Sequence, residues 1–184
     1  MNLSKVKYNC ISNGIGIRTA VFVTGCSHGC KGCFNQSIAN KNTGEPFTDD
    51  VKTAILRSLE PSYIHGLSLL GGEPMMSYNA PELAKLCREV RELYPTKNIW
   101  VYSGFTYEQI IADPIKLELL KECDVLVDGK FVQDLYSPLL RFRGSSNQRI
   151  IDIKKTLESG NVTLFLESAF FWLLTNGKKN HSQD

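Results

Sequence analysis

The fold is decided by a stretch that reads Arg18-Thr19-Ala20-Val21-Phe22-Val23-Thr24-Gly25-Cys26-Ser27-His28-Gly29-Cys30-Lys31-Gly32-Cys33-Phe34-Asn35. Residues 18–24 are mostly apolar, which predicts a strand buried on both faces, as in a parallel sheet. The glycine-rich segment that follows carries three cysteines and leaves the carboxyl end of this strand. Ligands of α/β proteins bind at that end, so the stretch predicts an α/β fold with a site in this loop.

The three cysteines have the spacing Cys26-x3-Cys30-x2-Cys33, which allows their thiolates to converge on one metal centre. A 4Fe-4S cluster contains four irons, so three thiolates would leave one iron without a protein ligand. A metal with an open coordination position can bind and activate a substrate. We therefore predict an iron–sulfur enzyme in which Cys26, Cys30 and Cys33 are the metal ligands.

A structural zinc site is the alternative for these cysteines, and it requires a fourth ligand. His28 is the candidate nearby, and we expect it to be an exposed loop residue instead. The other three cysteines, Cys10, Cys87 and Cys123, are scattered along the chain. Cys87 falls on or beside the apolar face of a predicted helix, which predicts a buried thiol.

The composition is that of an ordinary globular protein and limits the kinds of partner. The chain has 184 residues, 42% hydrophobic and 22% charged, which fits one domain with a sizeable core. A net charge of +2 gives no argument for a nucleic-acid or membrane partner. The N-terminus has no apolar signal segment, and no apolar run approaches the roughly 20 residues of a membrane span. We expect a cytoplasmic protein whose six cysteines are thiols or metal ligands rather than disulfides.

Strands and helices alternate along the chain. The predicted strands cover residues 18–24, 66–70, 98–102 and 125–127. The predicted helices begin after the capping residues Thr48, Asn79, Thr106 and Asp113. This alternation is typical of parallel strands joined by right-handed crossovers. The chain is too short for eight such units, so we predict a partial, open β/α barrel with mainly parallel strands.

We assign residues 1–155 to this domain and residues 156–184 to a C-terminal extension. Within the extension, residues 162–166 are predicted to form a last strand. The polar residues 176–184 are predicted to be disordered.

Each predicted strand ends in a polar or glycine-rich group. Besides the cysteine loop, these groups are Gly71-Gly72-Glu73-Pro74, Ser103-Gly104 and Asp128-Gly129-Lys130. Glycines let a backbone approach a ligand closely and expose its N–H and C=O groups. Carboxylates and an ammonium at neighbouring strand ends could hold a zwitterionic ligand, such as an amino-acid moiety. Taken alone, residues 71–74 and residues 128–130 are also explained as plain turns, and it is the shared position of the groups that favours one site.

The combination of Cys26-x3-Cys30-x2-Cys33 with a downstream Gly71-Gly72-Glu73-Pro74 resembles the radical S-adenosylmethionine superfamily. More narrowly, the chain resembles the activating proteins of anaerobic ribonucleoside-triphosphate reductases, a family of glycyl-radical activases. The segments that carry this closer resemblance are Asn13-Gly14-x-Gly16-x-Arg18, Gly32-Cys33-Phe34-Asn35, Trp100-x-x-Ser103-Gly104, Val127-Asp128-Gly129-Lys130-Phe131 and Arg143-Gly144-Ser145-Ser146-Asn147-Gln148-Arg149. They lie within residues 10–155, most of the chain.

The resemblance implies a 4Fe-4S cluster on the three thiolates, with S-adenosylmethionine chelating the open iron through its amino and carboxylate groups. An electron from the reduced cluster would cleave S-adenosylmethionine to methionine and a 5′-deoxyadenosyl radical. This radical would take a hydrogen from a backbone glycine in the large subunit of the reductase and leave a glycyl radical there. A reductant such as flavodoxin would supply the electron.

The resemblance also implies roles for residues of the cofactor site. Gly71, Gly72 and Glu73 would lie beside the methionine amino group, with Gly72 giving the closest backbone approach. Gly32, Cys33 and Phe34 would lie on the adenosine side. The other implied contacts are Ser103, Asp128 and Lys130 with the methionine carboxylate or ribose, and Arg143 and Arg149 with the cofactor or the reductase. Many superfamily members carry an aromatic residue just before the third cysteine, where this chain has Gly32, so the residue that stacks on adenine is not assigned.

Two other functions stay open on the sequence. One is the activation of another glycyl-radical enzyme, such as a formate-lyase, which the short chain and residues 143–149 disfavour. The other is a non-catalytic zinc or iron–sulfur module.

Overall fold

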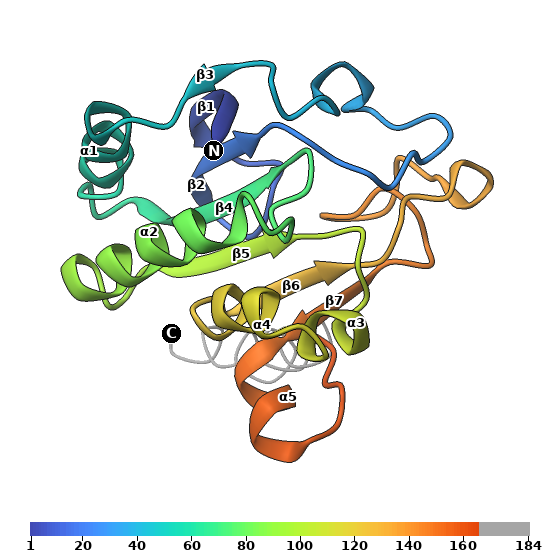
Figure 1. Cartoon of the computed structure of the whole chain (residues 1–184). Coiled ribbons are helices and arrows are strands. Elements are labelled where there is room, and N and C mark those ends of the chain that lie inside the picture. The colour runs from blue at the N-terminus through green and yellow to red at the C-terminus, as the bar shows by residue number, and fades with distance from the viewer. Residues whose placement is uncertain (166–184) are drawn as a thin grey trace, which may run out of the picture.

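The computed structural model describes residues 1–165 of the chain. Its strands are β1 (Asn2–Cys10), β2 (Ile17–Val23), β3 (Glu45–Pro46), β4 (Ile64–Gly71), β5 (Asn98–Tyr102), β6 (Val125–Asp128) and β7 (Arg149–Asp152). Its helices are α1 (Asp49–Ser58), α2 (Ala80–Leu93), α3 (Tyr107–Ile111), α4 (Pro114–Lys121) and α5 (Ile153–Ser159), with 3-10 turns at Gln36–Ile38 and Gln133–Leu135. The four predicted strands correspond to β2, β4, β5 and β6, and the four predicted helices to α1, α2, α3 and α4 (Figure 1).

The strands of residues 1–165 form one open sheet in the order β3-β1-β2-β4-β5-β6-β7. The four central strands, β2, β4, β5 and β6, are parallel to their neighbours within this group. The outer strands join antiparallel, which gives three parallel and three antiparallel pairings. The prediction of an open α/β fold is confirmed, whereas the prediction of a mainly parallel sheet is corrected to a mixed one.

The position of β1 and β7 in the sheet explains why the sequence does not predict them. β1 pairs antiparallel with β2, with Val6 opposite Val21, and most of its side chains are exposed or half-buried. β7 has only two buried residues, Ile150 and Ile151. An outer antiparallel strand has a solvated face, so it lacks the continuous apolar run that marks a central parallel strand.

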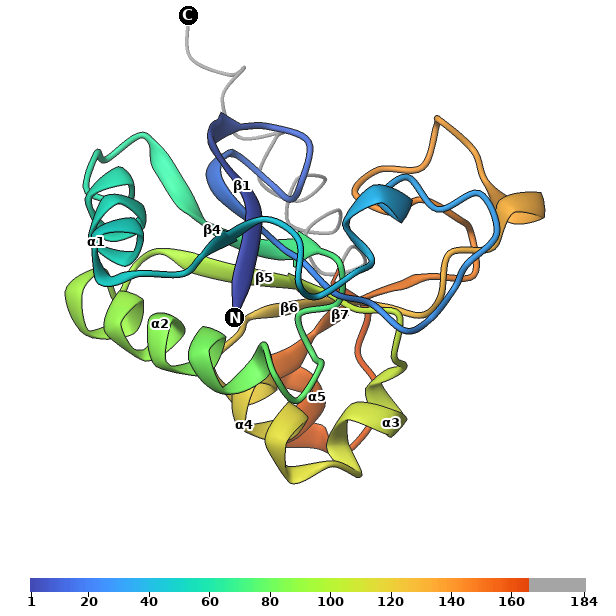
Figure 2. The same ribbon diagram turned by 45° about the horizontal axis from the view of Figure 1, so that its top comes forward.

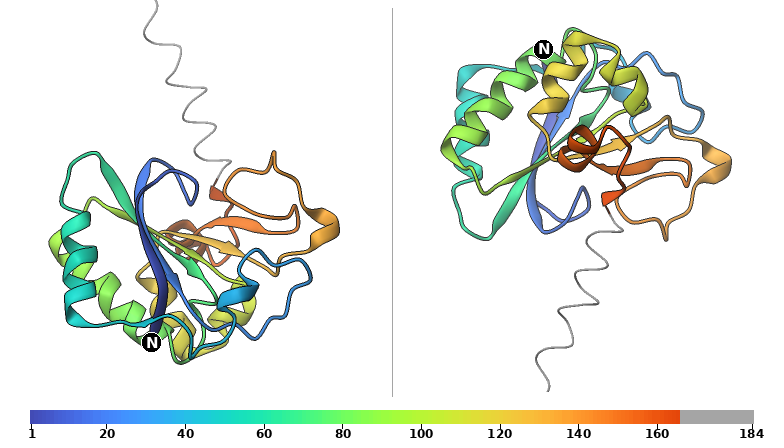
Figure 3. Two further views of the ribbon diagram at one scale, coloured as in Figure 1. Left: turned by 90° about the horizontal axis from the view of Figure 1, so that it is seen from above. Right: turned by 90° about the horizontal axis from the view of Figure 1, so that it is seen from below.

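The crossover helices cover one face of the sheet. The chain moves in one direction through β2, β4, β5 and β6, and right-handed crossovers in one direction place each connecting helix on the same side. The views from above and below show α1, α2, α3 and α4 along this face (Figure 3). Their buried side chains share one core with Val21, Leu69, Val101 and Leu126 of the central strands.

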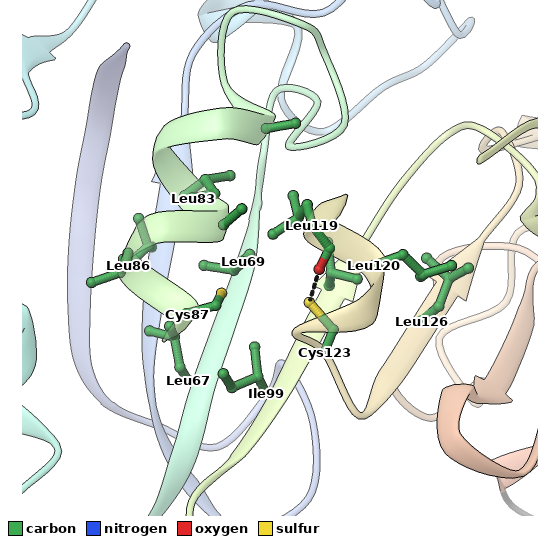
Figure 4. Packing of buried hydrophobic residues seen from close by; sticks show 14 of the residues in the cluster. Leu67, Leu69, Leu83, Leu86, Cys87, Ile99, Leu119, Leu120, Cys123 and Leu126 are labelled. Carbon is green, nitrogen blue, oxygen red and sulfur yellow. Dashed lines mark hydrogen bonds between the residues drawn. The ribbon is translucent and has the colours of Figure 1, made fainter. Parts of the chain in front are cut away.

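The centre of this helical layer is the contact of α2 and α4 with β4 and β5 (Figure 4). The side chains that meet there include Leu67, Leu69, Leu83, Leu86, Ile99, Leu119 and Leu120. Cys87 and Cys123 lie in the same cluster and are 0% and 1% exposed, which confirms Cys87 as a buried thiol. Burial raises the pKa of Cys123 well above its ordinary value, and its Sγ donates to the Leu119 carbonyl. Cys123 is therefore a protonated, structural thiol.

The opposite face of the sheet holds a buried guanidinium. Arg18 of β2 has no exposed surface, and the Trp100 ring lies 5.5 Å from its guanidinium carbon. The guanidinium donates at 2.6–3.1 Å to Ser68 Oγ, Asn98 Oδ1 and the carbonyl oxygens of Ile15, Leu67 and Asn98. Burial lowers the pKa of Arg18 to about 10, which leaves it charged at neutral pH. The buried Arg18 side chain thus links β2 to β4 and β5 by hydrogen bonds.

Replacing Arg18 by methionine is expected to lower the free energy of unfolding by about 3 kcal/mol, because several buried acceptors lose their donor. The exposed Arg57 on α1 provides the control, and Arg57→Met is expected to change stability by less than about 0.5 kcal/mol. Urea unfolding followed by circular dichroism measures both. Equal effects of the two substitutions would contradict a structural role for the Arg18 hydrogen bonds.

Three of the predicted helix caps are confirmed and one is corrected. The side chains of Thr48, Thr106 and Asp113 accept hydrogen bonds from the first turns of α1, α3 and α4. Asn79 precedes α2, but its side chain makes no capping hydrogen bond. It donates instead to the carbonyl oxygens of Thr24 and Glu73, both at 3.0 Å. The Asn79 side chain therefore bonds to backbone carbonyls outside α2 instead of capping the helix.

The C-terminal part of the described chain is α5 and a short segment after it. In place of the strand predicted for residues 162–166, Leu164 makes an isolated bridge to Ile151. Residue 166 and the predicted disordered residues 176–184 lie outside the described part of the chain. None of the helices within residues 1–165 has the length and apolar character needed to cross a membrane.

Candidate metal centre

The carboxyl ends of the four parallel strands meet at one edge of the sheet. The cysteine loop, residues 24–35, leaves β2 there, and residues 71–74 follow the end of β4. The rim segment, residues 130–148, follows β6 and lies beside the cysteine loop at the same end (Figure 2). Parallel strands in neighbouring positions end at the same edge, so this topology explains the predicted convergence.

A cleft of about 190 Å³ opens between these strand ends. All three cysteines of the loop line it, together with Phe34, Gly71, Gly72, Glu73 and Ser103. The structure therefore brings the predicted metal ligands together with most of the predicted cofactor residues. The predicted site residues that do not line this cleft are Gly32, Asp128, Lys130, Arg143 and Arg149.

Cys26, Cys30 and Cys33 are free thiols that are half-buried in the cleft. Burial raises the pKa of Cys26, and the charges of Glu73 and the other two cysteines act in the same direction. Within residues 1–165, no three His, Cys, Asp or Glu side chains are grouped to hold a single metal ion. A 4Fe-4S cluster makes a different demand, because each thiolate bonds its own iron at a separate corner. Three free thiols around one cleft are a donor set that fits such a cluster.

The backbone at Gly71 and Gly72 passes directly against the cysteine loop. A Cβ added to Gly72 would lie 2.4 Å from the carbonyl oxygen of Gly25. Gly71 has a φ of +113°, and its Cβ would lie 2.6 Å from the carbonyl oxygen of Val23. Gly72 N donates to that Val23 carbonyl and Glu73 N to the Gly25 carbonyl, both at 2.8 Å. Glycine is therefore required at both positions.

Glu73 is only 1% exposed, and its carboxylate accepts four hydrogen bonds. Oε1 accepts from Ser103 Oγ and from the Met75 amide, both at 2.9 Å. Oε2 accepts from His28 Nε2 and from the Gly104 amide, both at 2.7 Å. These donors compensate for the burial of the carboxylate. Glu73 thus connects the cysteine loop with the ends of β4 and β5.

The structure corrects the prediction that His28 is an exposed loop residue, because only 7% of its side chain is exposed. Its ring meets Phe105 edge-on at 4.5 Å and covers Gly104, where a Cβ would lie 2.4 Å from the ring. Its Nε2 is bonded to Glu73, so this nitrogen is not presented as a fourth ligand beside the cysteines. These partners are distant in sequence, and no local signal reveals them.

Phe34 lies at the edge of the cleft and is 69% exposed. It forms an aromatic cluster with Phe131 and Tyr136, whose ring centroids lie 5.2 and 5.6 Å from the centroid of the Phe34 ring. Gly32 has a φ of +70°, and a Cβ there would lie 2.8 Å from the Gln133 side chain. An aromatic residue at position 32 would therefore have a strained backbone and would displace the Gln133 side chain. In this chain the aromatic ring stands after the third cysteine instead.

A second cleft, separate from the cysteines, is lined by Asp128, Lys130 and Arg149. Asp128 is 1% exposed and forms a hydrogen-bonded ion pair with the guanidinium of Arg149. Arg149 also donates to both carboxylate oxygens of Glu108, at 2.9 and 3.0 Å. Arg143 donates to a backbone carbonyl of its own segment at 2.6 Å. The charges of Asp128 and Arg149 are thus directed to each other rather than to the cysteine cleft.

The Arg149–Glu108 pair gives a pH dependence that can be measured. Hydrogen bonds from Arg149 lower the pKa of Glu108 from 4.5 to about 2. A carboxylate with a lowered folded-state pKa adds stability above its unfolded pKa, and this stability is lost as the pH falls through the folded pKa. We expect the difference in unfolding free energy between wild type and Glu108→Gln to shrink from pH 6 to pH 2.5. The difference is expected to be small at every pH because the Glu108 side chain is 57% exposed, and a constant difference would contradict the assignment.

Two asparagines that the sequence does not assign to the site hold its loops together. Asn35 Nδ2 donates to the Gly71 carbonyl at 2.8 Å, and Asn79 joins Thr24 to Glu73. The position of Asn35 two residues after the third cysteine is a signal that could have identified it. For Asn79, its place before a helix gives a stronger but incorrect signal.

Comparison with known proteins places the chain in a family. Residues 12–151 match the family described as 4Fe-4S single cluster domain. Anaerobic ribonucleoside-triphosphate reductase-activating proteins of Escherichia coli K12 and Salmonella typhi are 43% and 42% identical over 140 residues, which cover 75% of this chain and 90% of theirs. The protein of that name from Enterobacteria phage T4 is 40% identical over 151 residues, 82% of this chain and 93% of its own. The chain therefore belongs to the 4Fe-4S single cluster domain family and to the family of anaerobic ribonucleoside-triphosphate reductase-activating proteins.

Proposed function

We propose that this protein activates an anaerobic ribonucleoside-triphosphate reductase by cleaving S-adenosylmethionine reductively and generating a glycyl radical on the reductase. The observation that carries the proposal is that three free cysteines and the segment Gly71-Gly72-Glu73 line one cleft at the ends of parallel strands. Membership of a family whose members are named for reductase activation supports the same function.

In this proposal Cys26, Cys30 and Cys33 hold a 4Fe-4S cluster, with one iron left for S-adenosylmethionine. When bound, the reduced cluster supplies the electron that splits S-adenosylmethionine into methionine and a 5′-deoxyadenosyl radical. The chain supplies binding, orientation and shelter from water. We further propose that residues 1–155 form a partial β/α barrel of the radical S-adenosylmethionine type, which the single-sided helical layer supports.

The residues of the cleft have separate tasks in binding. Gly71 and Gly72 are proposed to lie beside the methionine amino group, and their missing side chains let the end of β4 pack directly against the backbone of Val23 and Gly25. Glu73 carries a buried negative charge, which is weakly screened and favours the methionine ammonium. Phe34, with its aromatic partners on the rim segment, offers a surface for the adenine. Ser103 acts through Glu73, to which it donates its hydroxyl hydrogen.

The partners in this proposal are the large subunit of the reductase, which carries the glycine, and a reductant such as flavodoxin. We place the reaction in the cytoplasm, where reduced thiols are maintained. The second cleft, with Asp128 and Lys130, remains a proposed contact for the polar parts of S-adenosylmethionine or for the reductase.

Anaerobic reconstitution with iron and sulfide tests the proposed function. We expect cluster absorbance, formation of 5′-deoxyadenosine after chemical reduction, and a glycyl radical signal by electron spin resonance when the purified reductase is added. Failure to form a cluster or to cleave S-adenosylmethionine would overturn the enzyme proposal in favour of a metal-binding module. Cleavage with a radical on a formate-lyase, and none on the reductase, would identify the other activase.

A further inference from the structure

We infer that His28 is a positioning residue that fastens the cysteine loop to Glu73 and thereby sets where S-adenosylmethionine sits relative to the thiolates. The inference rests on the proposed function, because it concerns the same cleft. His28 lies between the proposed cluster ligands Cys26 and Cys30 and is not itself a proposed ligand.

The His28 ring occupies a slot between the ends of β4 and β5. Its Nε2 is 2.7 Å from Glu73 Oε2, and its ring contacts Phe105 at 4.5 Å between centroids. An ionised carboxylate can only accept hydrogen bonds, so Nε2 carries the hydrogen and donates it. The slot exists because residue 104 is glycine, since a Cβ there would lie 2.4 Å from the ring. The bond therefore links one point of the loop to two strand ends.

Other contacts fasten mainly the ends of the loop. In its middle, the exposed Ser27 Oγ makes one long contact of 3.8 Å with Met76 Sδ. At the start, Gly25 N and Cys26 N donate to backbone carbonyls of residues 38 and 39. At the end, Asn35 Nδ2 donates to the Gly71 carbonyl at 2.8 Å. Residues 27–32 form neither helix nor strand, and the buried His28 side chain fastens this middle part to the sheet.

The consequence for the site follows from the sequence positions. Cys26 and Cys30 flank His28 by two residues on each side, so the backbone that sets two of the three sulfur positions depends on this bond. The same bond restrains Glu73, whose charge we propose to attract the methionine ammonium. Because hydrogen bonds to charged groups are among the stronger ones, its removal is expected to increase loop opening about tenfold or more.

The first experiment uses the full chain without a cluster. His28→Phe keeps a ring in the slot but removes the donor, and His28→Gln places an amide near the position of Nε2. Ser27→Ala is the matched control, an exposed neighbour in the same loop whose hydroxyl makes only a long contact of 3.8 Å with Met76 Sδ. Alkylation of Cys26, Cys30 and Cys33 by iodoacetamide, followed by peptide mass spectrometry, is expected to be about tenfold faster in His28→Phe. Rates within about threefold of wild type are expected for the other two variants.

The second experiment uses the reconstituted, chemically reduced protein. S-adenosylmethionine is titrated while the change that it causes in the spin-resonance signal of the cluster is recorded. The concentration at half-saturation is expected to rise about tenfold in His28→Phe and to stay within about threefold of wild type in His28→Gln and Ser27→Ala. Iron content per chain is expected to be the same in all four proteins, because the three ligands are retained.

The outcomes separate the inference from the proposed function. If His28→Phe has the alkylation rates of wild type and the same S-adenosylmethionine concentration at half-saturation, the inference is overturned and the proposed function is unaffected. A defect in His28→Phe that His28→Gln does not repair would also overturn it, because a restored donor to Glu73 would then not restore the loop. Wild-type protein without a cluster or cleavage would overturn the function instead, while the alkylation rates would still test the bond.

The inference can still be tested if His28→Phe does not fold. If circular dichroism shows that His28→Phe is unfolded, His28→Asn replaces it, because its shorter amide cannot reach Glu73. Repair by glutamine but not by asparagine supports the inference, and equal behaviour of the two overturns it.

Discussion

Cys30→Ala is expected to abolish cleavage of S-adenosylmethionine, with a loss of at least about 1,000-fold, or about 4 kcal/mol of transition-state free energy. Each iron with a protein ligand needs its own thiolate, and two thiolates leave two corners of the cluster unheld. The buried Cys87 and Cys123 belong to the helical core and do not line the cleft, so they are not placed to substitute. Cys30 is half-buried and lies outside the core clusters of the described chain, so the variant is expected to fold normally.

The measurements for this prediction are iron and sulfide content, cluster absorbance and 5′-deoxyadenosine formed per chain. Cys87→Ala is the matched control, since it removes a thiol from the same chain without touching the cleft. It is expected to cost stability, because Cys87 has no exposed surface, yet to retain the cluster and cleavage. A Cys30→Ala protein that turns over at the wild-type rate would refute the ligand assignment.

Gly72→Ala is expected to reduce cleavage by about 100-fold, the second largest effect. Its Cβ would lie 2.4 Å from the Gly25 carbonyl oxygen, so the two segments must separate by about 1 Å to reach ordinary contact. The obstacle is backbone and cannot be relieved by a side-chain rotation. The shift would also strain the hydrogen bonds that join Gly72 to Val23 and Glu73 to Gly25. A misplacement of about 1 Å between reacting groups is enough for a 100-fold loss.

Gly160→Ala separates this effect from the general cost of removing a glycine. Gly160 has a φ of +70° but open space around its Cβ, and it lies at the end of α5, outside the cleft. Alanine there is expected to cost about 1 kcal/mol of stability and to leave cleavage unchanged. Cleavage assays and thermal unfolding of both variants provide the comparison, and a Gly72→Ala protein with undiminished cleavage would contradict the close-approach argument.

The parts of the fold that sequence reasoning predicted are those with local signals. The apolar runs of β2, β4, β5 and β6 are continuous because parallel strands are buried on both faces. The caps at Thr48, Thr106 and Asp113 are formed by neighbours in sequence, so a short window contains the whole interaction. The alternation of strands and helices also predicted that the cysteines and Gly71-Gly72-Glu73 lie at the ends of strands.

The parts that were missed depend on partners far away in the chain. His28 is buried by residues 73, 104 and 105, and Asn79 bonds to a carbonyl 55 residues away. Asp128 follows a strand end as predicted, but Arg149 on the neighbouring strand pairs with it and turns its charge away from the cysteine cleft. Antiparallel outer strands escape detection because half of each strand is solvated.

The sequence by itself predicted the α/β alternation, the three cysteines that we propose as cluster ligands, and the strand ends at which the cleft lies. These depend on residue type and spacing, which local hydrogen bonding and burial translate directly into structure. Only the tertiary structure decided that the sheet is mixed, that Glu73 accepts four hydrogen bonds, and that His28 holds the cysteine loop. Those contacts join separate strand ends, and a buried polar group takes whichever partner the fold brings within reach.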